Sequence, residues 1–177
     1  MIKNQNNTRP PIARHTNRYR EPDKELESGL WQAYCEEQVL GAVMLECYDI
    51  ATTGKTLVPQ TLELLRPEYF HDFSMGKTAF RARIFKAMQG CYEEYGTVEP
   101  LTLSHYLKKT EQYHSGDIES LRWIITNTMC SLDAPHYAVI VKENGIKRMV
   151  KYYTEKGMMD KAREVLGDGL AKGGYDL

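Results

Sequence analysis

Apolar residues recur every three or four positions along most of the chain, which is the period of an α-helix rather than a strand. One face of the first predicted helix repeats an apolar residue at every fourth position: Cys35, Val39, Val43 and Cys47. Residues spaced in this way lie above one another on a helix. The pattern therefore predicts a first helix whose apolar face turns toward the core.

A second strong helical pattern follows a polar loop at residues 49–59 and a short helical stretch at residues 60–65. Gly96 follows it directly, and glycine is favoured at the left-handed position that ends a helix. The pattern predicts a long helix ending at Gly96. Its apolar face would carry Phe80, Ile84, Met88, Cys91, Tyr92 and Tyr95.

Proline marks the next helix starts, because proline at the first helical position loses no required hydrogen-bond donor. Pro100 begins one helix, residues 115–128 form another, and Pro135 opens the last long one. Gly157 is expected to break that helix, and residues 158–170 can return beside it as its partner. The last long helix would be lined by Tyr137, Val141, Met149 and Tyr152 or Tyr153.

No segment alternates apolar and polar residues as a strand does, and no internal repeat is found. The expected fold class is therefore all-α: a small helical head followed by an antiparallel helical hairpin at about residues 134–170. With 177 residues, of which 42% are hydrophobic, one domain with a packed core is expected. We expect a basic, disordered leader at residues 1–28, a helical domain at 29–172 and a tail at 173–177.

Charge is unevenly distributed, although the net charge is only −1. Five basic residues precede the first acidic one, Glu21: Lys3, Arg9, Arg14, Arg18 and Arg20. We interpret this leader as a solvated arm, with contact to phosphates or an acidic surface as the alternative.

Candidate chemistry is sparse. Gly54-Lys55-Thr56 resembles the end of a phosphate-binding loop, but Asp49 stands where that loop needs glycine, so a polar loop is the better interpretation. The histidines lack metal-ligand spacing. Glu36-Glu37 and Glu93-Glu94 are interpreted as solvated helix faces, because adjacent helical residues do not converge. No catalytic, cofactor-binding or metal-binding residue is proposed.

Two observations indicate where in the cell the protein is expected. No segment reaches the roughly 20 apolar residues that a membrane span requires. The four cysteines are widely separated and form no C-x-x-C pair, so we interpret them as reduced core residues. A cytoplasmic protein without membrane contact is expected. These cysteines are Cys35, Cys47, Cys91 and Cys130.

Four short segments occur in a fixed order along the chain: Glu36-Glu37-Gln38-Val39-Leu40-Gly41, Phe80-Arg81-Ala82-Arg83-Ile84-Phe85, Glu99-Pro100-Leu101-Thr102-Leu103 and Tyr137-Ala138-Val139-Ile140-Val141-Lys142-Glu143-Asn144-Gly145-Ile146-Lys147-Arg148. This order resembles the amino-terminal domain of DnaB-type replicative DNA helicases. The chain departs from the family pattern in places: a histidine is missing before Arg81, Glu99 replaces aspartate, and Gly145 replaces alanine. The loop at residues 48–59 is also longer than usual.

The resemblance implies a non-catalytic assembly and partner-docking module of DNA replication, similar to the collar of the replicative helicase. The family itself consists of ATP-dependent helicases, but no motor fits in the remaining chain, so this chain is not expected to be an enzyme. Expected partners are further copies of the chain, as a dimer or a ring of dimers, and primase, a helicase loader or a host replicative helicase.

The hairpin surface is the expected interface, because a two-helix hairpin cannot bury a large apolar surface alone. DNA contact is expected to be indirect or weak. The alternative function is a small single-stranded-DNA-binding accessory protein that uses the basic leader and the patch between Lys147 and Tyr153. The proposed interface residues are Tyr137, Val141, Gly145, Arg148, Met149, Tyr152, Tyr153, Met158 and Met159.

Overall fold

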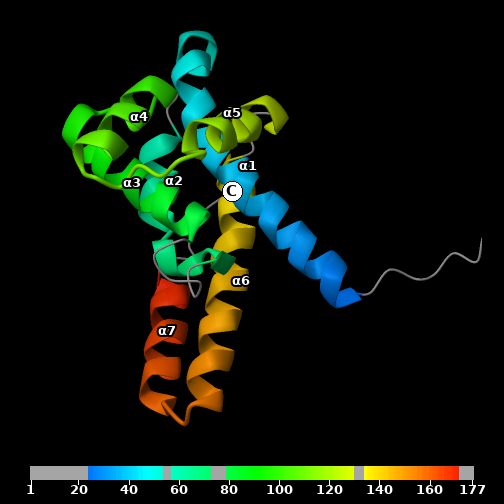
Figure 1. Cartoon of the computed structure of the whole chain (residues 1–177). Coiled ribbons are helices and arrows are strands. Elements are labelled where there is room, and N and C mark those ends of the chain that lie inside the picture. Colours follow the sequence, from blue (N-terminus) through cyan, green and yellow to red (C-terminus); the bar gives the residue numbers. More distant parts are fainter. Residues whose placement is uncertain (1–23, 54–56, 73–78, 130–133, 172–177) are drawn as a thin grey trace, which may run out of the picture.

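The computed structural model describes residues 24–53, 57–72, 79–129 and 134–171, of which 24–28, 46–53 and 168–171 are described by their backbone alone. Every regular element in these ranges is helical, which confirms the all-α prediction (Figure 1). The elements are α1 (Lys24–Thr53), α2 (Val58–Leu64), the 3-10 turn η1 (Pro67–Tyr69), α3 (Phe80–Tyr95), α4 (Pro100–Lys109), α5 (Asp117–Asn127), α6 (Ala134–Glu155) and α7 (Met159–Ala171).

The head is built around α1, which contacts α2, α3, α5 and α6. Its middle section is buried on nearly all sides, and its amino-terminal turns project away from the rest of the molecule (Figure 1). The centre of the core includes an aromatic pair, Phe70 and Phe85, whose ring centroids lie 4.9 Å apart. Around it pack fully buried aliphatic residues, among them Leu40, Met44, Leu65, Ile84, Met88, Leu103 and Leu107.

α6 and α7 leave the head side by side and run in opposite directions (Figure 1). Gly157 lies between them with a φ of 71°, in the left-handed region that glycine adopts without strain. Gly96 ends α3 in the same way, with a φ of 69°, and Pro100 occupies the first turn of α4. Glycine and proline therefore end and begin these helices where the sequence predicts.

α1 is longer than the sequence pattern predicts at both ends. It begins at Lys24, so residues 24–28 belong to a helix and not to a leader, and it continues to Thr53 through part of the expected loop. The reason is local: no proline interrupts the chain between Lys24 and Gly54, and the helix tolerates the two glycines in this range, Gly29 and Gly41. None of the described helices combines the length and apolar character needed to cross a membrane.

Candidate functional site

The carboxylate of Glu36, on α1, is the centre of a polar cluster between the head and the hairpin. Its Oε2 lies 2.7 Å from Nε of Arg81, and its Oε1 accepts the backbone N–H of His71 at 2.6 Å. Nη2 of Arg148, on α6, lies 3.7 Å from the same Oε1. Glu36 is only 1% exposed, so its interpretation as part of a solvated helix face is wrong. Glu37 is half-buried beside it.

Burial affects both ends of this cluster. It raises the pKa of Glu36, against the opposing effects of Arg81, the His71 amide and Arg148. Burial also lowers the pKa of Arg148, although Glu36 opposes this. Burying a charge is costly, and in this cluster the carboxylate and the two guanidinium groups offset that cost for one another. Removing one partner would leave the other charge buried without its counter-charge. The cluster therefore specifies which faces of α1, α3 and α6 meet.

Arg148 joins the hairpin to the head through two further contacts. Its Nη1 donates to Oε1 of Gln32 at 2.8 Å, and its Nη2 donates to the carbonyl of Tyr69 at 2.5 Å. One guanidinium thus contacts α1 and η1 at once, a geometry that suits the several fixed donors of arginine. Arg148 was expected at an interface between chains; the structure places it in the junction of its own chain.

Gly145, one turn before Arg148 on α6, lies against the backbone of η1. A Cβ atom at this position would lie 2.6 Å from Cα of Tyr69, closer than packed atoms approach. The glycine therefore permits α6 to approach η1 closely. Gly145 and Val141 are both buried within the chain, and Val141 is only 2% exposed.

Gln38 and Gly41 fasten α1 to the end of α5. The Gln38 Nε2 donates to the carbonyl of Asn127 at 3.0 Å, and its Oε1 accepts the backbone N–H of Met129 at 3.1 Å. A Cβ atom on Gly41 would lie 1.7 Å from Oγ1 of Thr128. The side-chain amide thus satisfies backbone groups at a helix end while the glycine permits the close approach.

Arg83 and Asp117 form a two-pronged ion pair between α3 and the start of α5. The guanidinium nitrogens lie 2.7 Å and 2.9 Å from the two carboxylate oxygens, and Asp117 also accepts the His114 N–H at 2.7 Å. Burial alone would raise the pKa of Asp117, but the Arg83 and His114 interactions together lower it. The ion pair therefore fixes the position of the first residues of α5 against α3.

These contacts explain the segments that carry the family resemblance. Gln38 and Gly41 come from the first segment, Arg81 and Arg83 from the second, and Gly145 and Arg148 from the fourth. Each of them meets another helix or a helix end rather than a solvent-filled site. The motifs therefore encode the way the helices are held together.

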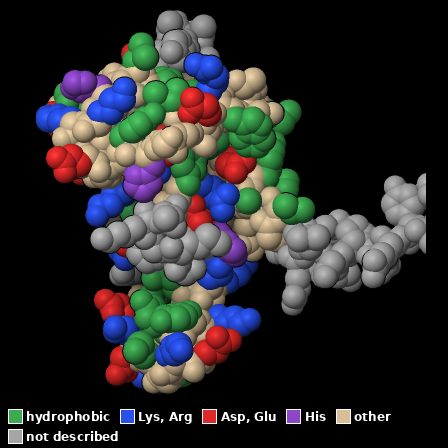
Figure 2. All heavy atoms as spheres, in the orientation of Figure 1, with side chains coloured by type: hydrophobic (Ala, Val, Ile, Leu, Met, Phe, Trp, Pro, Cys, Tyr) green, Lys and Arg blue, Asp and Glu red, His purple; other side chains and the backbone are tan. Residues whose placement is uncertain are grey.

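The outer part of the hairpin carries a different kind of surface, which we call the hairpin surface: Met149, Tyr152, Tyr153, Met158, Met159 and Leu166. The side chains of Tyr152, Met158, Met159 and Leu166 are between 45% and 55% exposed. In the space-filling view, hydrophobic side chains lie among charged ones on this part of the molecule (Figure 2). Five of the residues predicted for an interface thus lie on the hairpin, and Met149, Tyr152 and Tyr153 among them line a common groove. The other two are Met158 and Met159.

A groove of about 540 Å³ lies where the hairpin surface meets the head. Phe70, Met149, Tyr152 and Tyr153 line it together with Glu68, His71 and Arg148. Of its polar members, Arg148 is engaged already by Gln32 and Tyr69. The groove therefore offers an aromatic and aliphatic wall to a partner side chain, with Glu68 and His71 beside it.

The basic patch between Lys147 and Tyr153 is smaller than the sequence indicates. Arg148 is turned into the junction, and Lys151 lies 4.0 Å from Glu155 on the same helix. Each tyrosine ring has a lysine above it, with Lys156 at 6.0 Å from the Tyr152 centroid and Lys161 at 5.8 Å from that of Tyr153. Single-stranded-DNA binding through this patch stays a hypothesis.

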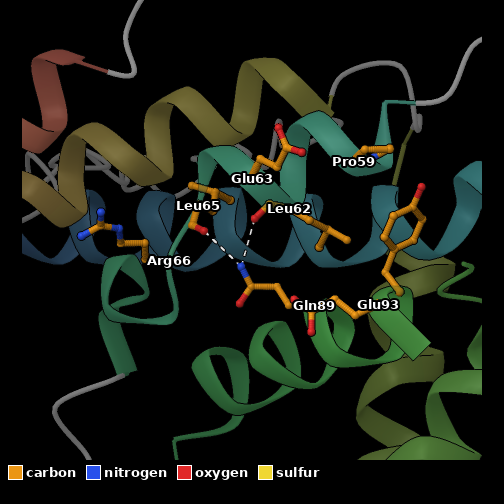
Figure 3. Close-up of a pocket in the computed structure, with 8 residues that line it drawn as sticks. Pro59, Leu62, Glu63, Leu65, Arg66, Gln89 and Glu93 are labelled. Carbon is orange, nitrogen blue, oxygen red and sulfur yellow. Dashed lines mark hydrogen bonds between the residues drawn. The ribbon is translucent and has the colours of Figure 1, made fainter. Parts of the chain in front are cut away.

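Another concave region, of about 750 Å³, lies between α2 and α3 (Figure 3). Glu63 and Glu93 lie on opposite sides of it, with Arg66 at one end. The Gln89 amide points across it and donates to the carbonyls of Leu62 and Leu65, at 3.0 Å and 3.3 Å. These bonds satisfy the last carbonyls of α2, so Gln89 has a structural role here.

The sequence analysis missed an exposed patch at the base of α1, which we call the aromatic patch: Leu30, Trp31, Tyr34, Met129 and Tyr137. Trp31 stacks on Tyr34 with 5.5 Å between ring centroids, and Tyr34 meets Tyr137 edge-on at 6.1 Å. Leu30, Trp31 and Met129 are between 52% and 78% exposed. Tyr137, predicted for the same interface as Tyr152, belongs to this patch instead. The sequence signal was the Leu30-Trp31 pair, which stands just before the first predicted core residue.

Other sequence candidates fall outside this picture. Gly54-Lys55-Thr56 lies outside the described residues, as does Cys130. Cys35 and Cys91 are free thiols in the core, and burial raises the pKa of each to about 11. Within the described ranges, no three His, Cys, Asp or Glu side chains gather as a metal site would require.

Comparison with known proteins places the chain in a family. The model described as "DnaB-like helicase N terminal domain" matches residues 31–143, more than half of the chain. The chain therefore belongs to the DnaB-like helicase N-terminal domain family, as its motifs predicted, and is a module related to replicative helicases. The comparison with curated proteins finds no match. The family match ends within α6, so it covers the head and leaves out the hairpin surface.

Proposed function

We propose that this chain is a non-catalytic assembly and docking module of DNA replication that self-associates through its hairpin surface. The observation that carries the proposal is the half-exposed state of Tyr152, Met158, Met159 and Leu166 on a hairpin outside the main core. Membership of the DnaB-like helicase N-terminal domain family supports a role as a helicase-related module. Primase, a helicase loader or a host replicative helicase would be the further partner.

The physical argument rests on how little the hairpin buries by itself. On α7, Met159, Ala162 and Leu166 share one side of the helix; Ala162 is buried there, whereas Met159 and Leu166 stay about half exposed. Contiguous apolar surface on a soluble domain marks an interaction site. Methionine adapts to irregular partners, and tyrosine is enriched at interfaces. A second hairpin of the same kind would cover both helices.

Light scattering on the full chain tests self-association. Tyr152→Ser combined with Met159→Ser should shift the molar mass toward the 20.4 kDa of one chain while the helical circular dichroism is kept. Leu101→Ser is the matched control, since Leu101 is 84% exposed on α4 in the head. An unchanged mass in the double variant, or an equal shift in the control, would contradict the proposal.

A measurement of ATP turnover tests the proposal that the chain is non-catalytic. We expect no turnover by the purified chain, with or without single-stranded DNA. Robust turnover that copurifies with the chain at constant specific activity would overturn it.

A further inference from the structure

The aromatic patch is a preformed surface that the hairpin does not account for. Tyr137 and Tyr152 are separated by 15 residues of α6, about 22 Å along a helix axis. The two surfaces therefore lie at different ends of that helix. Elements from three parts of the chain build the patch: the beginning of α1, the residues after α5, and the first turns of α6.

Internal contacts hold the patch rings at fixed angles. Trp31 and Tyr34 are stacked with 24° between their planes, and Tyr137 stands at 84° to Tyr34. The Tyr34 hydroxyl donates to the Met129 sulfur at 3.5 Å. Exposed aromatic side chains held in place in this way suit a polyproline II segment, which needs no hydrogen-bonded partner strand and packs proline rings against aromatic side chains.

A segment with this chemistry exists in the same chain. We propose that the aromatic patch binds the chain's own Arg9-Pro10-Pro11-Ile12 segment. Two consecutive prolines favour the polyproline II conformation. Arg9 supplies a guanidinium that can lie on the exposed face of Trp31, and Ile12 supplies an aliphatic contact for Leu30. The proposal does not depend on self-association through the hairpin surface.

The chain length between the two sites allows this contact. Twelve residue steps separate Ile12 from Lys24, the first residue of α1, and span up to about 40 Å when extended. Trp31 lies seven residues into α1, only about 10 Å along its axis. A tether of this length gives an effective concentration in the millimolar range, so a contact with a dissociation constant of about 1 mM is already half-occupied.

A second copy of the chain is the rival occupant, and the dependence on protein concentration distinguishes it from the chain's own segment. A second copy of the chain would cover the patch only as the protein concentration rises. The chain's own segment would cover it at any concentration. A consequence of self-coverage is that a partner carrying a similar proline-containing segment must displace the leader before it binds here.

Tryptophan fluorescence reports directly on the patch, because the chain has two tryptophans and Trp31 is one of them. Trp123 is exposed on α5, so Trp123→Phe leaves Trp31 as the single reporter without disturbing the core. In this background we expect Trp31 to be protected from acrylamide, with a quenching constant independent of protein concentration. Replacing Arg9, Pro10 and Pro11 together by Ser should raise that constant at least twofold.

The control changes three residues of the same leader outside the segment: Asn4→Ser, Asn6→Ser and Asn7→Ser. These changes should leave the quenching constant unaltered. The proposal is overturned if Trp31 of the Trp123→Phe protein is quenched as readily as free N-acetyltryptophanamide, or if the Arg9, Pro10 and Pro11 replacements change nothing. Protection that disappears on dilution would assign the patch to a second copy instead.

Discussion

Gly145 of α6 and Tyr69 of η1 approach so closely that a single methyl group on the glycine would overlap the tyrosine backbone, at 2.6 Å from Cα. The neighbouring atoms belong to main chain and to Cβ of Tyr69, so no flexible side-chain end can move aside. The seating of the hairpin on the head therefore depends on the absence of a side chain at residue 145.

Gly145→Ala should lower the free energy of unfolding by about 1–2 kcal/mol. Overpacking a core contact costs about 1–3 kcal/mol, and the better helix propensity of alanine offsets up to about 1 kcal/mol of it. Urea unfolding followed by circular dichroism measures the change. The controls are Gly29→Ala and Gly167→Ala, helical positions with nothing within 4 Å of the added methyl, where a gain of about 0.5–1 kcal/mol is expected. Equal effects at all three positions would refute the close approach.

Asp117→Asn should destabilise the protein by about 3 kcal/mol at neutral pH, because it leaves the Arg83 guanidinium without its counter-charge in a buried setting. The folded-state pKa of Asp117 lies below its ordinary value, so this carboxylate binds a proton less readily when folded. Its contribution is therefore present above the unfolded pKa of about 4 and is lost as the pH falls through the folded pKa.

Unfolding measured from pH 7 down to pH 2 checks both parts of the Asp117 prediction. The gap between the parent and Asp117→Asn should be constant above about pH 5 and should narrow below it. Asp160→Asn is the control: Asp160 lies 3.6 Å from Arg163 in full exposure, and such a pair contributes less than about 1 kcal/mol. A gap that widens on acidification would contradict the assignment.

Gln38→Met should cost about 2 kcal/mol, since it leaves the Asn127 carbonyl and the Met129 N–H without their partner. Methionine has nearly the shape of glutamine, so packing changes little. Hydrogen exchange of the Met129 amide should become faster, which locates the effect at the end of α5. Gln60→Met, at an exposed position of α2, should leave both stability and this amide unchanged.

Cys35 and Cys91 should resist alkylation by iodoacetamide at pH 8 in the folded protein. Burial raises the pKa of each thiol to about 11, so the reactive thiolate is scarce and the sulfur is inaccessible. Peptide mapping by mass spectrometry would show both thiols unmodified in buffer and modified in urea. Rapid labelling in buffer would show that the head opens around α1 and α3.

The helix pattern was predictable because apolar spacing and the residues that start or stop helices are local signals. Gly96, Pro100 and Gly157 lie where the structure needs them, and Ile84, Met88 and Leu103 are buried as expected. Glu36 was misinterpreted because the reasoning gave α1 one apolar face and one solvated face. The middle of α1 is instead enclosed by other helices, and residues on nearly all its sides are buried.

Surfaces were harder to predict than helices. The sequence placed Tyr137 and Tyr152 on one interface because both lie on the same helix, but the structure assigns them to different surfaces. The same interface prediction included Val141 and Gly145, although packing within the chain already buries both. Distant segments such as η1 determine which residues of α6 are buried within the chain and which stay exposed. The local spacing of residues along the helix carries no information about those distant segments.

Arg148 couples movement of the outer part of α6 to the head. The guanidinium holds the helix to α1 and η1 at a point between Tyr137, near one end, and Tyr152, near the other. From Arg148 to the end of α6 at Glu155 the helix extends about 10 Å. A load applied to the hairpin by a bound protein is therefore transmitted through Arg148 to the buried carboxylate of Glu36, and the stiffness of the junction that Arg148 and Gly145 form with the head sets how far the two ends can move independently.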